Sequence, residues 1–154
     1  MSTNIENKLA ELGITLPQAA APAANYVPFV ISGNLLFVSG QLPMEGGKIA
    51  VAGTLGGDVT LDDGQKAARL CAINIIAQAR AALGDLDRVT RVVRLGGFVA
   101  SAPGFTDQPK VVNGASDLMV TVFGDAGRHA RAAVGVNVLP LGAAVEIDAI
   151  IEFA

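Results

Sequence analysis

The chain has 154 residues, of which 51% are apolar and 16% are charged, a composition typical of one globular domain with an extensive core. A net charge of −3 and the lack of tryptophan argue against a nucleic-acid partner, because such proteins present basic patches and stacking aromatic side chains. One cysteine and one histidine exclude an internal disulfide, a multi-cysteine metal site and a paired-histidine ribonuclease mechanism. Without a transmembrane-length apolar run or a signal-peptide pattern, we expect a single cytoplasmic domain over residues 1–154 that contacts no membrane.

The first part of the chain predicts a short helix and a hairpin. Apolar residues at helical spacing before a glycine indicate a helix over residues 4–13, and a Pro- and Ala-rich linker follows it, so residues 1–24 form an N-terminal extension. Two β-type runs flank Ser32-Gly33-Asn34, a pattern typical of a hairpin. The strands are expected at residues 26–31 and 35–38, with a short edge strand at 48–51.

Two long helices and three more strands follow. Thr60 and Asp63 have capping-box spacing, which predicts a helix that begins there and ends before Gly84. The later elements are expected as a strand at 88–100, a helix at 107–123 and two strands on either side of Pro140. This order predicts an α+β fold in which both helices cover one face of a mixed sheet. The other face is left for water or another subunit.

The last two strands carry the most informative polar residues. Alternation places the valines from Val134 to Val138 in the core and Arg131 on the opposite face. In the final strand, alternation buries the face formed by Val145, Ile147, Ala149 and Ile151 and leaves Glu146, Asp148 and Glu152 on the opposite face. We therefore expect Arg131 and Glu146 on the same outward face. They form either a cross-strand ion pair or a polar site that grips a small carboxylate, and alternation alone favours the ion pair.

Four other side chains with chemical potential have ordinary structural explanations. Cys71 lies in an apolar helical stripe without an activating base, which indicates inert core. His129 is a possible proton shuttle, but a lone histidine at a helix-to-strand turn is more often exposed. Tyr26 at a strand start is normally a packing residue with its hydroxyl at the rim. Asn113 falls on the polar flank of the second long helix, where exposure is the default.

Read together, three motifs resemble the Rid superfamily, the YjgF/RidA family of imine deaminases long labelled as perchloric-acid-soluble endoribonucleases (L-PSP). The resemblance runs from residue 25 to the C-terminus. Its motifs are Ser32-Gly33-Asn34-Leu35-Leu36-Phe37-Val38-Ser39-Gly40-Gln41-Leu42-Pro43, Val112-Asn113, and Arg131 followed by Leu139-Pro140 and Val145-Glu146-Ile147-Asp148. It implies a chorismate-mutase-like fold with a mixed sheet and two long helices on one face. It also implies homotrimers with ligand clefts between subunits.

The same resemblance implies an activity and a set of site residues. The family hydrolyses 2-imino acids to 2-keto acids and ammonia without a metal or organic cofactor. By analogy Arg131 would bind the substrate carboxylate, and Glu146 would position or activate the attacking water. The residues that would line the cleft are Tyr26, Ser39, Gly40 and Asn113.

Two departures indicate a divergent branch of this family. Ala133 stands where many members have a cysteine, and the chain is longer than a typical member. An imine is already electrophilic, so a poised water suffices without a strong nucleophile. The alternative function is a non-catalytic trimer that binds small carboxylates as a sensor or protein partner. Retention of both Arg131 and Glu146 favours the deaminase, because a pure carboxylate binder gains nothing from an acidic neighbour.

Overall fold

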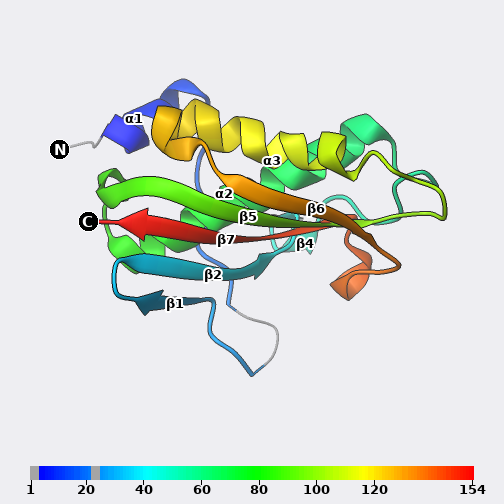
Figure 1. The fold of residues 1–154 in the computed structure, drawn as a ribbon, viewed down its shortest axis with the longest axis horizontal. Helices are drawn as coiled ribbons and strands as arrows, with labels where there is room; N and C mark the ends of the chain where they lie inside the picture. Colours follow the sequence, from blue (N-terminus) through cyan, green and yellow to red (C-terminus); the bar gives the residue numbers. More distant parts are fainter. Residues whose placement is uncertain (1–3, 22–24) are drawn as a thin grey trace.

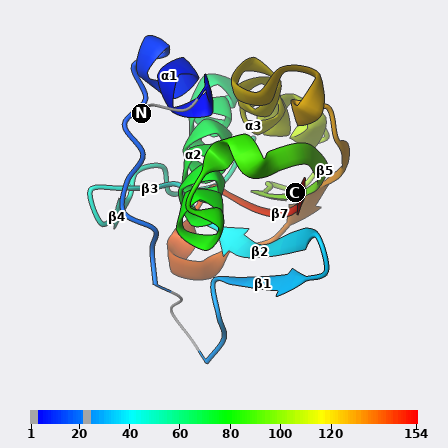
Figure 2. The same cartoon turned by 90° about the vertical axis from the view of Figure 1, so that its left-hand side faces the viewer.

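A five-stranded mixed sheet carries two long helices on one of its faces (Figures 1 and 2) in the computed structural model, which describes residues 4–21 and 25–154. The helices are α1 (Asn4–Glu11), α2 (Leu61–Leu83) and α3 (Gln108–Phe123). The strands are β1 (Phe29–Ser32), β2 (Leu35–Gln41), β3 (Met44–Glu45), β4 (Lys48–Ile49), β5 (Val89–Ala100), β6 (Ala130–Val136) and β7 (Val145–Phe153). The sheet order is β1-β2-β7-β5-β6, and only β5 and β6 run parallel. The predicted α+β class is confirmed.

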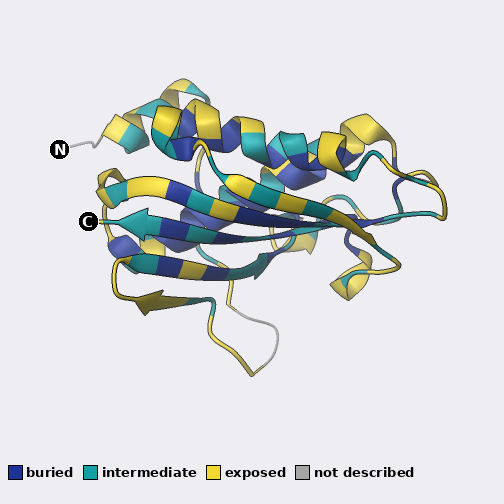
Figure 3. Cartoon of the chain, in the orientation of Figure 1, coloured by how far each residue is buried: buried dark blue, intermediate teal, exposed yellow. Residues whose placement is uncertain are grey.

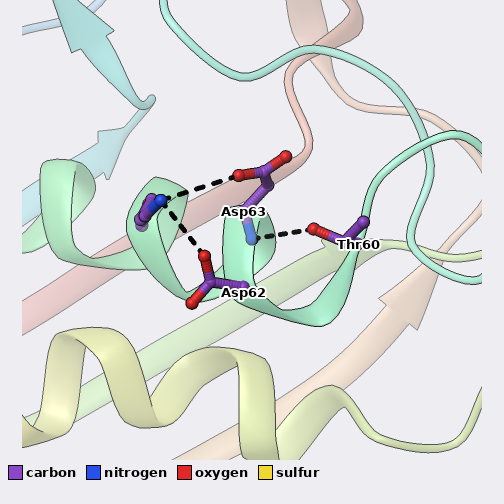
Figure 4. A network of polar contacts seen from close by, with 4 residues as sticks. Thr60, Asp62 and Asp63 are labelled. Atoms are coloured by element: carbon purple, nitrogen blue, oxygen red, sulfur yellow. Dashed lines mark hydrogen bonds and ion pairs between the residues drawn. The ribbon is translucent and has the colours of Figure 1, made fainter.

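Local capping fixes where α2 begins and ends. The Thr60 hydroxyl accepts a hydrogen bond from the Asp63 backbone N–H at 3.1 Å (Figure 4). Gly84 ends the helix with a φ of 78°. Lys66 pairs with Asp62 at 3.1 Å across one helical turn. Because that pair is exposed, its contribution to stability is small. The cap therefore decides the start of the helix, as the sequence pattern predicts.

The core lies between the helices and the sheet (Figure 3). On β7 every second residue from Val145 to Ile151 is buried against the helices, as alternation predicts. Cys71 lies in the buried stripe of α2, and burial raises the pKa of its thiol well above the ordinary value, with the charge of Glu146 adding to the shift. The thiol therefore stays protonated, in agreement with an inert core cysteine.

The N-terminal helix and the first strand have other bounds than the sequence predicts. Helix α1 spans Asn4–Glu11 and not residues 4–13, and β1 spans Phe29–Ser32 and not residues 26–31. The Asp87 carboxylate accepts hydrogen bonds from the backbone N–H groups of Asn4 and Ile5 at 3.0 and 2.9 Å, which fixes the start of α1. The predicted edge strand pairs with β3, a strand too short to leave a sequence pattern. Within the predicted N-terminal extension, residues 1–3 and 22–24 lie outside the described residues.

The predicted faces of β6 are wrong. Parallel pairing sets Arg131 beside the fully buried Leu95 on the helix-covered face, and sets Val134 beside Phe98 on the open face. Val134 is 45% exposed. Alternation failed here because it assumes that the more apolar face of a strand is covered by its own chain. Here α3 instead offers hydrogen-bond acceptors to Arg131.

Gly97 lets α3 approach the sheet closely. A Cβ at this position would lie 2.6 and 2.9 Å from the two methyl carbons of Val112. We expect Gly97→Ala to lower the free energy of unfolding by about 1–3 kcal/mol through overpacking. The measurement is chemical denaturation. In a Val112→Ala background the same substitution should cost much less, and an equal cost in both backgrounds would contradict the packing explanation.

Candidate functional site

The first candidate site is a pocket of about 410 Å³ on the open side of β2 and β7. Its lining includes the segment around Tyr26, the Ser39-Gly40 end of β2, the turn at Pro140 and Leu141, and Glu146. The pairing of β2 with β7 shifts register between Val38 and Gln41. Such a bulge re-aims the backbone, and here it turns Ser39 and Gly40 toward the pocket.

Glu146 is the acidic group of this pocket. A Cβ at residue 40 would overlap the Glu146 carboxylate, so glycine at this position leaves room for that side chain where it now lies. Burial raises the pKa of Glu146, and the negative charge of Asp148 raises it further. Asp148 itself pairs with Arg94 at 3.7 Å. Glu146 therefore holds a proton more tightly than an ordinary carboxyl group, which suits a group that exchanges protons with a ligand or water.

The second candidate site lies where α3 runs along β6 (Figure 1). The half-buried Arg131 donates from Nη1 to the Ser116 hydroxyl at 3.0 Å and from Nη2 to the Pro109 carbonyl at 2.9 Å. Helical periodicity places Asn113 on the same stripe of α3 as Pro109 and Ser116. The ion pairs of the described chain do not include Arg131, so its charge is held by neutral groups and remains available to an anion.

The structure divides the predicted site residues between two places. Those that line the pocket are Tyr26, Ser39, Gly40 and Glu146. Arg131 and Asn113 lie with α3 instead. The prediction that Arg131 and Glu146 share a face is wrong, because Arg131 aligns with Leu95 on the covered face while Glu146 aligns with Phe98 on the open one. The two side chains make neither the predicted ion pair nor a shared site within one subunit.

Sequence reasoning misses Ser116 as a polar partner of Arg131. It also predicts an exposed His129, which instead is half-buried and bonded to Ser116. In the structure, His129 Nε2 lies 2.8 Å from the Ser116 hydroxyl, and Nδ1 lies 2.6 Å from the Gly127 carbonyl. Helical spacing could have pointed to Ser116, because it lies three residues after Asn113 and therefore on the same stripe of α3.

Residues 4–21 and 25–154 contain neither a metal-binding cluster nor a membrane-spanning helix. No group of three or more His, Cys, Asp or Glu side chains in that part of the chain is arranged to hold a metal ion. None of the helices described there has the length and apolar character needed to cross a bilayer.

Comparison with known proteins identifies relatives over nearly the whole chain. Residues 6–152 match the family described as "YjgF/chorismate mutase-like, putative endoribonuclease". Protein TCP17 of Trypanosoma cruzi is 57% identical over 152 residues, which cover 98% of this chain and 95% of that protein. The crystal structure of Atu1372 from Agrobacterium tumefaciens is 62% identical with a TM-score of 0.92, covering 98% of this chain and 93% of that one. E. coli TdcF with bound serine is 25% identical with a TM-score of 0.66, covering 89% of this chain and 94% of that one.

The raised pKa of Glu146 can be tested by removing its charged neighbour. We expect Asp148→Asn to lower the pKa of Glu146 toward the ordinary carboxyl value without reaching it, because burial remains the larger cause. Since the folded state binds this proton more tightly than the unfolded chain, the free energy of unfolding falls as pH rises from the ordinary pKa through the raised one. That fall should be smaller in the variant. Carboxyl ¹³C NMR titration measures the pKa, with the exposed Asp125→Asn as control; an unmoved Glu146 pKa would contradict the assigned role of Asp148.

Proposed function

Because the chain belongs to the YjgF/chorismate-mutase-like family, we propose that it is a cytoplasmic, cofactor-free deaminase that hydrolyses reactive 2-imino acids to 2-keto acids and ammonia. The environment of Arg131 carries this proposal. Its guanidinium is half-buried and oriented by two neutral acceptors, and no carboxylate of the described chain neutralises it. A planar guanidinium in that state is suited to a two-point grip on a ligand carboxylate.

A composite cleft reconciles the two separated halves of the site. In a homotrimer, Arg131 and Asn113 of one subunit can face the Glu146 pocket of the next, as the family resemblance implies. Exposed apolar side chains on the open face and the turns beside it support such an assembly, because water-exposed patches of this kind usually mark interfaces. They include Val30, Phe37, Val134 and Val138, which are 51%, 40%, 45% and 73% exposed.

The proposed reaction uses the two halves in different ways. Arg131 binds the carboxylate and places the imine carbon near the water that Glu146 holds. The imine enters protonated on nitrogen, and water adds to its carbon as the Glu146 carboxylate accepts one proton of that water, which gives a neutral carbinolamine. Glu146 then returns its proton to the amino nitrogen. The C–N bond breaks as the hydroxyl oxygen forms the C=O bond of the 2-keto acid, and the hydroxyl proton leaves with ammonia as ammonium. The raised pKa of Glu146 favours this return step.

Small carboxylates fit the site better than RNA does. The relative TdcF has been solved with serine, a small amino acid, bound to it. The net charge of this chain is −3, which opposes phosphate backbones. Its one histidine is hydrogen-bonded on both ring nitrogens within the chain. The remaining alternative is a trimer that binds small carboxylates as a sensor, and it predicts ligand binding without turnover.

The proposal is tested by substituting Arg131. An amino-acid oxidase generates 2-imino acids in situ, and ammonia or keto-acid release is followed with and without the protein. Arg131→Lys keeps the charge but loses the planar grip, so kcat/KM should fall at least about tenfold, or about 1.4 kcal/mol of transition-state binding. Arg131→Ala should lose more, and its affinity for keto acids should fall in parallel.

Melting temperatures of both variants provide the control for folding. A folded Arg131→Ala protein with wild-type imine hydrolysis would leave the proposal without support. A wild-type protein that binds keto acids but releases no extra ammonia would favour the sensor.

The composite cleft makes a separate prediction about subunits. Light scattering should give a trimer mass at micromolar concentration. Arg131→Ala and Glu146→Gln should each be inactive alone, but an equal mixture that is unfolded and reassembled together should recover about a quarter of wild-type activity, since random trimers place intact halves in about one cleft in four. A monomer mass, or a mixture as inactive as its components, would contradict a site built between subunits.

A further inference from the structure

Three groups behind Arg131 form one directed chain of hydrogen bonds that ends on its guanidinium. His129 Nδ1 lies 2.6 Å from the Gly127 carbonyl, which can only accept, so Nδ1 carries a hydrogen. In the neutral ring Nε2 is then an acceptor, and the Ser116 hydroxyl lies 2.8 Å from it. The hydroxyl donates to Nε2 and is left with lone pairs, one of which accepts from Arg131 Nη1 at 3.0 Å. Each donor in the chain meets an acceptor.

This chain restricts the guanidinium in a way that a lone serine would not. A free hydroxyl rotates, and its hydrogen can turn toward the cation. Here His129 Nε2 takes that hydrogen, so a lone pair of Ser116 faces Arg131. The Pro109 carbonyl holds Nη2 from the same helix at 2.9 Å. With both terminal nitrogens anchored on α3, the plane of the guanidinium is set by the helix, and its other N–H groups make no hydrogen bond to the described chain.

We propose that Ser116 and His129 are positioning residues that orient Arg131 toward the ligand carboxylate, with His129 acting through the Ser116 hydroxyl. This inference rests on the proposed function only in taking Arg131 as the carboxylate-binding group. Neither residue touches the reacting atoms. Their contribution is to hold the planar donor in one orientation before the ligand arrives, which reduces the ordering that binding requires.

Carboxylate binding provides the first test. The probes are 2-oxobutanoate and its uncharged methyl ester, and their affinities are measured by titration calorimetry or ligand-observed NMR. Ser116→Ala and His129→Leu should each raise the Kd of 2-oxobutanoate about tenfold, as loss of one hydrogen bond to a charged group implies. His129→Gln retains an acceptor near the position of Nε2 and should bind within about twofold of wild type. The methyl ester should bind all proteins alike, because it lacks the carboxylate charge.

Coupling between the two residues provides the second readout. The double variant Ser116→Ala/His129→Leu should bind 2-oxobutanoate no more weakly than either single variant, because both substitutions break the same chain. Arg128→Ala is the matched control, since Arg128 is adjacent to His129 but exposed and paired with Asp125. Wild-type affinity in Ser116→Ala, additive losses in the double variant, or equal weakening of the ester would overturn the proposal.

A ligand-free measurement separates this inference from the proposed function. Long-range ¹⁵N NMR correlation on the wild-type protein should show His129 with its hydrogen on Nδ1 and Nε2 unprotonated. The Arg131 side-chain N–H groups should exchange with water faster in Ser116→Ala than in wild type or Arg128→Ala. If the wild-type protein neither binds 2-oxobutanoate nor hydrolyses imines, the proposed function fails. These spectra still show whether His129 and Ser116 hold Arg131 through the chain of hydrogen bonds. A hydrogen on His129 Nε2, or unchanged exchange of the Arg131 N–H groups in Ser116→Ala, would overturn the proposed positioning role.

Discussion

The parallel register between β5 and β6 decides where each functional group lies. Because Leu95 aligns with Arg131 and Phe98 with Val134, the guanidinium faces α3 while a valine faces outward. The same strand β5 aligns Phe98 with Glu146 on its other edge. Shifting β6 by one residue would exchange these faces and bring Arg131 to the side of Glu146. The observed register instead separates a cation from a carboxylate by the thickness of the sheet, and so keeps them from neutralising each other.

That separation explains the electrostatic state of both groups. An arginine next to Glu146 would lower the pKa of the carboxyl, whereas its surroundings of low polarity and the nearby Asp148 raise it. Arg131 likewise would be a poorer receptor for a ligand if a carboxylate of its own chain occupied its donors. The Glu146 carboxyl therefore has a raised pKa and can exchange its proton. The Arg131 guanidinium is bonded to neutral groups and makes no ion pair within the described chain. A site assembled between subunits can combine the two only when they meet across a cleft.

The sequence predicts those features for which local chemistry leaves one answer. Thr60 and Gly84 bound α2 because capping and left-handed backbone geometry select those residue types. On β7 three acidic residues share one face, so alternation identifies the opposite face, which carries Val145, Ile147, Ala149 and Ile151, as the buried one. On β6 the same rule fails, because Val134 is apolar yet points away from the helices of its own chain. Alternation records which face avoids water, and it cannot tell whether a helix or another subunit covers that face.

The helices also contribute to the site from the covered side of the sheet. On α2, the buried Asn74 donates to the backbone carbonyls of Leu42 and Met44 at 3.0 and 3.1 Å, which holds the loop that walls the Glu146 pocket. On α3, Ser116 holds Arg131. In both halves the supporting group is neutral, so it orients its partner without supplying a competing charge. Neutral amides and hydroxyls also stay in one protonation state, so the geometry they impose persists while Glu146 gains or loses its proton. Rigid helices thus fix the direction of Arg131 and the loop beside Glu146 without adding a charge of their own.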